Sequence, residues 1–142
     1  MNRSQHTHLN VAALSHAGMT GKNNEDRFAV SSYTMEGDRP VLFAVVSDGI
    51  GGHRAGEVAA ELAVNYISEK VSESNGRQPL QIMESAIHAA SEAIAARSAS
   101  KEEQYGMGAT CACSSVMMPR STASCTQVWS IVRRWIDPSR TR

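Results

Sequence analysis

Two short acidic segments contain the residue types that metal-assisted chemistry needs. The first is NNEDRF at residues 23–28, which contains Glu25 and Asp26, and the second is SDGIGGH at residues 47–53, where Asp48 ends an apolar run. Mg²⁺ prefers oxygen ligands and keeps several waters while accepting one or two carboxylates. An Asp at a strand end, followed by a Gly with an accessible carbonyl, meets this requirement. Together the two segments indicate a metal site.

Each segment also has an ordinary interpretation. An Asp-Gly pair after a strand is more often a plain turn, and a Glu-Asp pair in a polar loop is usually a solvated loop. Neither segment is specific by itself, so the metal interpretation depends on their joint occurrence.

The strands that must position these residues follow from the hydrophobic pattern. Apolar residues alternate with polar ones at residues 8–14 and 27–34, which predicts two strands. The continuous apolar run PVLFAVVSD at residues 40–48 predicts a central strand that is buried on both faces. A last strand is predicted for GMGATCAC at residues 106–113.

Between these strands the hydrophobic period becomes helical. Apolar residues recur at helical spacing from Ala55 to Val71, and again from Pro79 to about Ser98. The segment SNGRQP between the two stretches is typical of a helix end followed by a new helix start. The predicted order is therefore strand, strand, strand, helix, helix, strand.

The composition of the chain argues against several classes of function. The 142 residues suit one domain, and 14 basic residues balance 14 acidic ones, so nothing indicates a nucleic-acid surface. No stretch approaches the roughly 18 apolar residues of a membrane span, and we expect a cytoplasmic protein without a membrane partner. Three cysteines do not make a disulfide framework. Cys111 and Cys113 alternate along a predicted strand and are expected to be buried, reduced thiols.

The motifs resemble a known family, the bacterial metal-dependent protein phosphatases, also called PPM-type or type 2C serine/threonine phosphatases. The matching segments are NNEDRF, VVSDGIGGHRAGEVAA at residues 45–60, and GMGATCAC. The resemblance implies an α+β fold, a four-layer α-β-β-α sandwich of two antiparallel sheets, of which this chain supplies the N-terminal portion only. It also implies a phosphorylated protein substrate, two Mg²⁺ or Mn²⁺ ions, and hydrolysis of phosphoserine or phosphothreonine by a metal-activated water.

The resemblance also implies roles for individual residues. Asp48 would bridge the two ions, the Gly49 carbonyl would bind one of them, and Glu25 would bind the other. Asp26 would orient a water, so Asp48 and Asp26 are the candidate catalytic residues. The family usually has an arginine four residues before the glutamate that corresponds to Glu25, and this arginine binds the substrate phosphate. Here Lys22 lies next to that position and is the candidate phosphate-binding residue. Its ammonium group would attract phosphate as a point charge, without the two parallel hydrogen bonds that an arginine forms.

The C-terminal segment does not match the family. We expect residues 1–113 to form the N-terminal part of a phosphatase domain and residues 114–142 to be a non-family tail, which contains five arginines, no lysine and one acid. The family's later Val-Gly-Asp-Ser turn and two further aspartates are not found in it. We expect the tail to be mostly disordered, or helical around residues 129–135. A shifted reading frame is one hypothesis for its origin.

Three functions therefore stay open. The chain is a weakly active phosphatase domain, a catalytically silent remnant of one, or a non-catalytic module that binds a phosphoprotein or a metal. A sandwich that lacks half of its layers would leave strand edges unpaired and apolar surface open. We therefore expect self-association through exposed sheet edges.

Overall fold

The structure is a computed structural model that describes the chain except for residues 5–9, 20–22, 52–54, 118–126 and 137–142; for residues 127–136 it describes the backbone alone. The described elements are, in chain order, β1 (Asn2–Arg3), β2 (Asp26–Met35), β3 (Arg39–Ile50), α1 (Ala55–Glu73), α2 (Pro79–Ser100), the 3₁₀ turn η1 (Glu102–Gln104), β4 (Gly108–Met117) and β5 (Gln127–Ile136).

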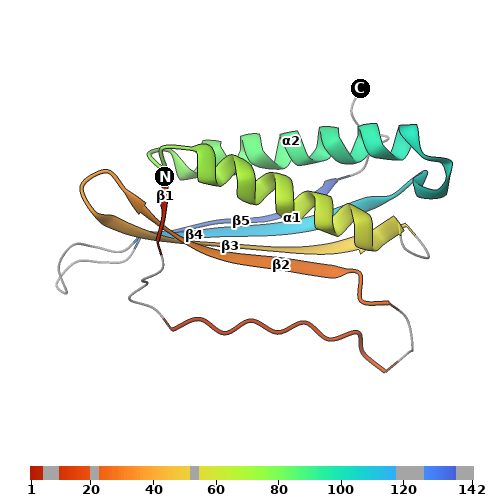
Figure 1. Ribbon diagram of the computed structural model, residues 1–142, viewed down its shortest axis with the longest axis horizontal. Helices are drawn as coiled ribbons and strands as arrows, with labels where there is room; N and C mark the ends of the chain where they lie inside the picture. Colours follow the sequence, from red (N-terminus) through yellow and green to blue (C-terminus); the bar gives the residue numbers. More distant parts are fainter. Residues whose placement is uncertain (5–9, 20–22, 52–54, 118–126, 137–142) are drawn as a thin grey trace.

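The described strands form one antiparallel sheet in the order β1-β2-β3-β4-β5, and α1 and α2 both lie on one face of it (Figure 1). β3 is the central strand, as its apolar sequence predicts. The predicted strands at residues 27–34 and 106–113 correspond to β2 and β4, and both predicted helices are present. The fold is α+β, and the described residues supply one sheet and one layer of helices.

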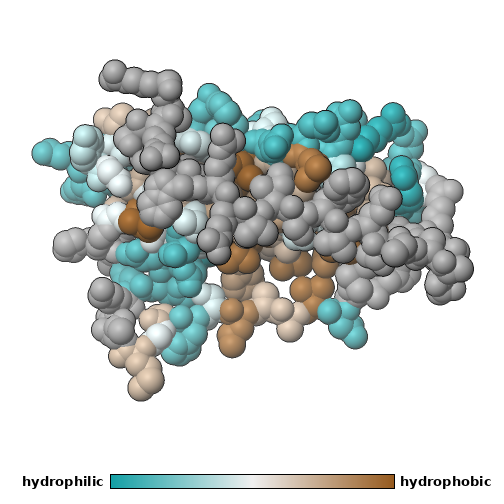
Figure 2. Space-filling model, turned by 180° about the vertical axis from the view of Figure 1, so that it is seen from behind, coloured by the Kyte–Doolittle hydropathy of each residue, from teal (hydrophilic) through white to brown (hydrophobic). Residues whose placement is uncertain are grey.

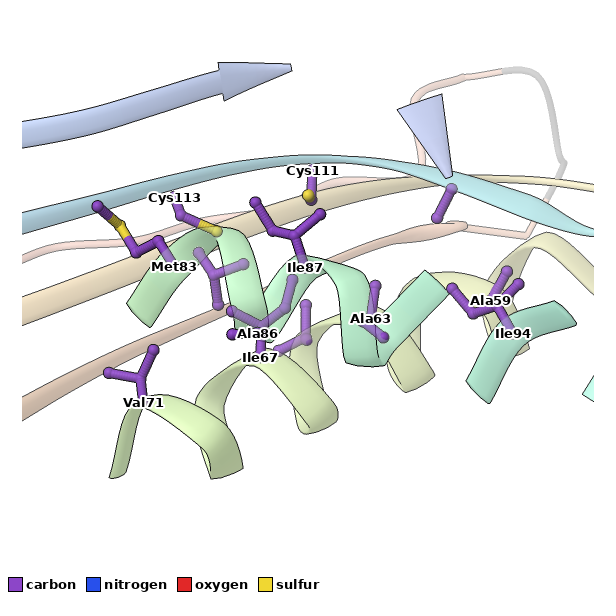
Figure 3. Close-up of a cluster of buried hydrophobic side chains, with 14 of the residues drawn as sticks. Ala59, Ala63, Ile67, Val71, Met83, Ala86, Ile87, Ile94, Cys111 and Cys113 are labelled. Carbon is purple, nitrogen blue, oxygen red and sulfur yellow. The ribbon is translucent and has the colours of Figure 1, made fainter. Parts of the chain in front are cut away.

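The core lies between the helices and the sheet. Side chains of α1 and α2 point toward each other and toward β4 (Figure 3). Alanines on the two helices, among them Ala59, Ala63, Ala86 and Ala90, are completely buried. Their small side chains let the two helices lie close to each other and to the sheet. Among the residues that the structure describes, no helix combines the length and the apolar character needed to cross a membrane.

Two cysteines belong to this core. Cys111 and Cys113 are buried thiols on the face of β4 that the helices cover (Figure 3). This confirms the prediction of buried, reduced thiols for these two residues. A hydrogen bond with Cys111, together with burial, raises the pKa of the Cys113 thiol well above its usual range. The thiol therefore stays protonated at neutral pH, and its role is in packing.

The face of the sheet away from the helices is open. Along β2 and β3 buried residues alternate with residues that are half-buried or exposed. Phe28 is 40% exposed, Val46 55% and Ile50 41%, so apolar side chains reach the surface on this side. Figure 2 shows hydrophobic side chains at the lower side of the molecule, which is the side of the sheet away from the helices.

The prediction that the central strand is buried on both faces is therefore wrong. The helices cover one face only, and no helix or strand among the described residues packs against the other. Residues 10–19 pass on that side without regular structure (Figure 1). An apolar strand of this kind is typical of a sheet enclosed between two layers. We call the surface that contains Phe28, Val46 and Ile50 the open face.

The two ends of the chain differ from the sequence predictions. A strand was predicted at residues 8–14, but residues 10–14 have no regular structure and residues 8–9 lie outside the described part. Leu14 is 92% exposed, so the alternating pattern has nothing to pack against.

The predicted tail was expected to be disordered or helical, and this is wrong for residues 127–136. They form β5, which pairs with β4 along most of its length. This segment is rich in β-branched and aromatic residues, which favour a strand where a sheet edge is available for pairing.

Candidate metal site

The pairing of β2 with β3 brings two candidate acids together. Asp26 and Asp48 are direct partners in the antiparallel register, so their side chains leave the sheet on the same face. Both residues are exposed, at one end of the open face. The ion pairs found among the described residues include neither of them. Two carboxylates thus lie side by side where a cation can reach both.

Glu25 is linked to the same strand ends by its backbone. Its carbonyl oxygen accepts a hydrogen bond from the Gly49 amide at 3.3 Å. Its carboxylate lies against the first turn of α1, because a Cβ added to Gly56 would be only 2.4 Å from Glu25 Oε2. The positive end of the helix dipole favours a negative charge there. The carboxylate of Glu25 therefore lies at the end of β3 on the helix side of the sheet.

Gly49 is required by a close approach of two backbones. A Cβ at residue 49 would lie 1.9 Å from the Gly56 carbonyl oxygen. Only glycine leaves room for the start of α1 to pass so close to the end of β3. The glycine that the sequence indicates as a carbonyl ligand is thus also the contact point between strand and helix.

Sequence reasoning missed the polar residues that shape the NNEDRF segment. The Asp26 amide donates to Asn24 Oδ1 at 3.0 Å, and Asn24 Nδ2 donates to Ser15 Oγ at 2.7 Å. Arg27 Nη1 donates to the carbonyl oxygens of Asn24 and Asp26, at 2.9 and 2.8 Å. Arg27 Nη2 forms an ion pair with Glu57 in the first turn of α1. The only signal in the sequence was an arginine directly after two acids.

The donors present suit a hard divalent cation. The site offers carboxylate and carbonyl oxygens, which Mg²⁺ and Mn²⁺ prefer. Within the described part of the chain, no group of three or more His, Cys, Asp or Glu side chains is arranged to hold a metal. Lys22, the candidate phosphate-binding residue, lies outside the described residues.

Comparison with known proteins identifies the family. The family described as Protein phosphatase 2C matches residues 15–128, so the chain belongs to the protein phosphatase 2C family. It is 31% identical over 102 residues to the serine/threonine protein phosphatase PstP of Mycobacterium tuberculosis, covering 72% of this chain and 18% of the relative. It is 32% identical over 97 residues to the serine/threonine phosphatase stp of Listeria monocytogenes, covering 66% of this chain and 37% of the relative.

A solved structure shares the fold. The serine/threonine phosphatase Stp1 from Staphylococcus aureus superimposes with a TM-score of 0.59 at 22% identity, covering 92% of this chain and 57% of that one. The chain thus spans less than two fifths of the two curated relatives and over half of this structure. The sheet and its two helices are the N-terminal α+β portion of the phosphatase fold.

Proposed function

We propose that this chain carries the N-terminal part of the active site of a metal-dependent protein serine/threonine phosphatase. Asp48, Glu25 and the Gly49 carbonyl would hold Mg²⁺ or Mn²⁺, and Asp26 would orient a water. When bound, the ions supply Lewis acidity for hydrolysis of a phosphoserine or phosphothreonine ester. The substrate would be a phosphorylated protein in the cytoplasm. Lys22 would attract its phosphate.

One observation carries this proposal. The register that pairs Asp26 with Asp48 places two carboxylates on one exposed face of a rigid sheet. The hydrogen bond between Gly49 and Glu25 holds the third acid at the same strand ends. A divalent cation that contacted both carboxylates would be attracted to each of them. Family membership supports the same interpretation.

Metal binding is tested by replacing Asp48. We expect Mn²⁺ to bind the wild-type chain in a saturable way in a calorimetric titration, and Asp48→Asn to weaken this binding. Loss of an outer-shell partner costs about 10–100-fold in metal affinity, so loss of a direct ligand should cost at least about tenfold. Asp38→Asn is the matched control, because Asp38 is exposed in the turn at the far end of the same hairpin. Equal affinity in wild type and Asp48→Asn would overturn the proposed site.

Hydrolysis of a small aryl phosphate with Mn²⁺ separates the open functions. We propose weak activity or none, because the chain spans only part of the relatives that it matches. Robust turnover that Asp48→Asn abolishes would establish an active phosphatase domain. Saturable binding without turnover would indicate a metal-binding module. Neither turnover nor binding would indicate a silent remnant.

We also propose self-association at the exposed sheet edge and open face. Among the described residues, β1 pairs only with Tyr33 and Thr34 of β2. A charged residue on an edge strand opposes pairing between copies. Phe28→Lys should therefore lower the concentration-dependent increase in sedimentation coefficient. Tyr66→Lys, which replaces a 38% exposed aromatic residue on α1, should leave it unchanged. A wild-type chain that is monomeric at every concentration would contradict this proposal.

A further inference from the structure

We propose that Arg27 is a positioning residue for the metal site: its guanidinium holds the backbone on both sides of Glu25 against the first turn of α1. This inference rests on the proposed function. Arg27 would not touch metal or substrate. It would act by keeping the carboxylates of Glu25 and Asp26 at the end of β3.

The contacts of Arg27 carry the inference. Its Nη1 donates to the carbonyl oxygens of Asn24 and Asp26, the two residues that flank Glu25. Its Nη2 reaches Glu57 on α1. One rigid, planar group therefore connects the acidic segment to the helix that follows the glycine turn. Lysine ends in a compact ammonium group rather than a planar guanidinium group, so we expect it to reproduce these three contacts only in part.

The charge of Arg27 excludes a role as a direct ligand. Its guanidinium group has only donors and no acceptor, and its positive charge would repel a metal ion.

A role in gripping the substrate phosphate fits poorly as well. The surface hollow that Arg27 lines is also lined by the acidic residues Glu57 and Glu61. A phosphate bound there would meet two negative charges, while two nitrogens of the guanidinium already have acceptors.

Simple stabilisation is the remaining alternative. The side chains of Arg27 and Glu57 are 31% and 35% exposed, and solvent screens partly exposed ion pairs of this kind, so they contribute little to stability. The ion pair therefore has little effect on global stability. The bonds to the two carbonyl oxygens order a segment that carries two proposed site residues, and this is where we expect the larger effect.

Four variants test the proposal. Arg27→Met should weaken Mn²⁺ binding about tenfold, as loss of an outer-shell partner does, and Arg27→Lys should weaken it less. Glu57→Gln removes the ion pair but keeps the carbonyl bonds, so its Mn²⁺ affinity should stay within about twofold of wild type. Arg77→Met is the matched control, because Arg77 pairs with Glu36 in an exposed ion pair between the helix layer and the β2–β3 hairpin. It should leave the affinity unchanged.

A measurement without metal keeps the two proposals apart. In metal-free protein, Arg27→Met should speed hydrogen exchange of the Gly49 amide, which bonds to Glu25, while Arg77→Met should not. Unchanged exchange together with unchanged Mn²⁺ affinity would overturn the role of Arg27. If the wild type bound no Mn²⁺, the proposed function would fail, and the exchange result would still decide the positioning role. If Arg27→Met did not fold, the Mn²⁺ affinity of Arg27→Lys would be compared with that of Glu57→Gln. Equal affinities of these two variants would overturn the positioning role of Arg27.

Discussion

Gly49→Ala is expected to destabilise the protein strongly. The added Cβ would lie 1.9 Å from the carbonyl oxygen of Gly56 and 2.4 Å from its carbonyl carbon. Both are backbone atoms of α1, so the clash cannot be relieved by a side-chain rotation. Overpacking usually costs about 1–3 kcal/mol and sometimes more. We expect about 3–5 kcal/mol here, a large part of the stability of a small domain. The free energy of unfolding, measured with guanidinium chloride, checks this.

Gly106→Ala is the matched control for this clash. Gly106 has a positive φ of 74°, but a Cβ there would have no heavy atom within 4 Å. Its replacement therefore costs only the left-handed backbone conformation, about 1–2 kcal/mol. A Gly49→Ala protein as stable as Gly106→Ala would show that β3 and α1 can separate without loss of the fold. The requirement for glycine at residue 49 would then be wrong.

The sheet and helices could largely be predicted because their patterns are local. β3 is identified by a run of apolar residues, and α1 and α2 by helical spacing with glycine and proline between them. These signals need no knowledge of distant residues. The bounds moved by a few residues, as β4 begins at Gly108 and continues to Met117, past the expected domain boundary at residue 113. That boundary stays a prediction.

β5 could not be predicted by the same reasoning. Residues 127–136 contain several β-branched and aromatic residues, but a strand needs a partner, and the partner is the edge of β4. The lack of family motifs in this segment favoured disorder instead. Residues 10–14 show the opposite error, since an alternating pattern alone does not supply a neighbouring strand.

The residue types of the candidate site could be predicted from the sequence, but the contacts that hold these residues in place could not. Acidic residues and a glycine beside them are visible in the sequence, and the register of β2 with β3 then brings Asp26 beside Asp48. The contact between Gly49 and Gly56, and the contacts of Arg27 with Glu57, join residues on different elements. They depend on how the chain enters α1, which no local pattern specifies.

The open face connects the fold with the site. Asp26 and Asp48 leave the sheet on the same face as Phe28 and Val46, so these two proposed site residues and the exposed apolar residues form one surface. A second layer over this surface would both bury the apolar residues and enclose the carboxylates. Enclosure lowers the local dielectric constant and strengthens the attraction between carboxylates and a cation. Metal affinity and burial of the open face should therefore increase together.

The chain's two phenylalanines separate the contributions of the two faces of the sheet to stability. Phe43, in the middle of β3, is 1% exposed and belongs to the core beneath the helices. Its cross-strand partners are Ser31 and Ser115, whose small side chains leave room for the ring and could not fill its place. Phe43→Ala would leave a cavity, and we expect a loss of about 3–5 kcal/mol. The guanidinium chloride midpoint should fall while the slope of the transition stays unchanged.

Phe28→Ala provides the comparison because Phe28 stands on the open face of the adjacent strand and is 40% exposed. It removes the same atoms from the same sheet but leaves no enclosed cavity, so the expected loss is about 1 kcal/mol or less. The difference between the two variants compares the cost of removing a phenylalanine ring from the helix-covered face with the cost of removing one from the open face. Equal losses would mean that the open face is covered in solution, and the sheet would then be packed on both sides.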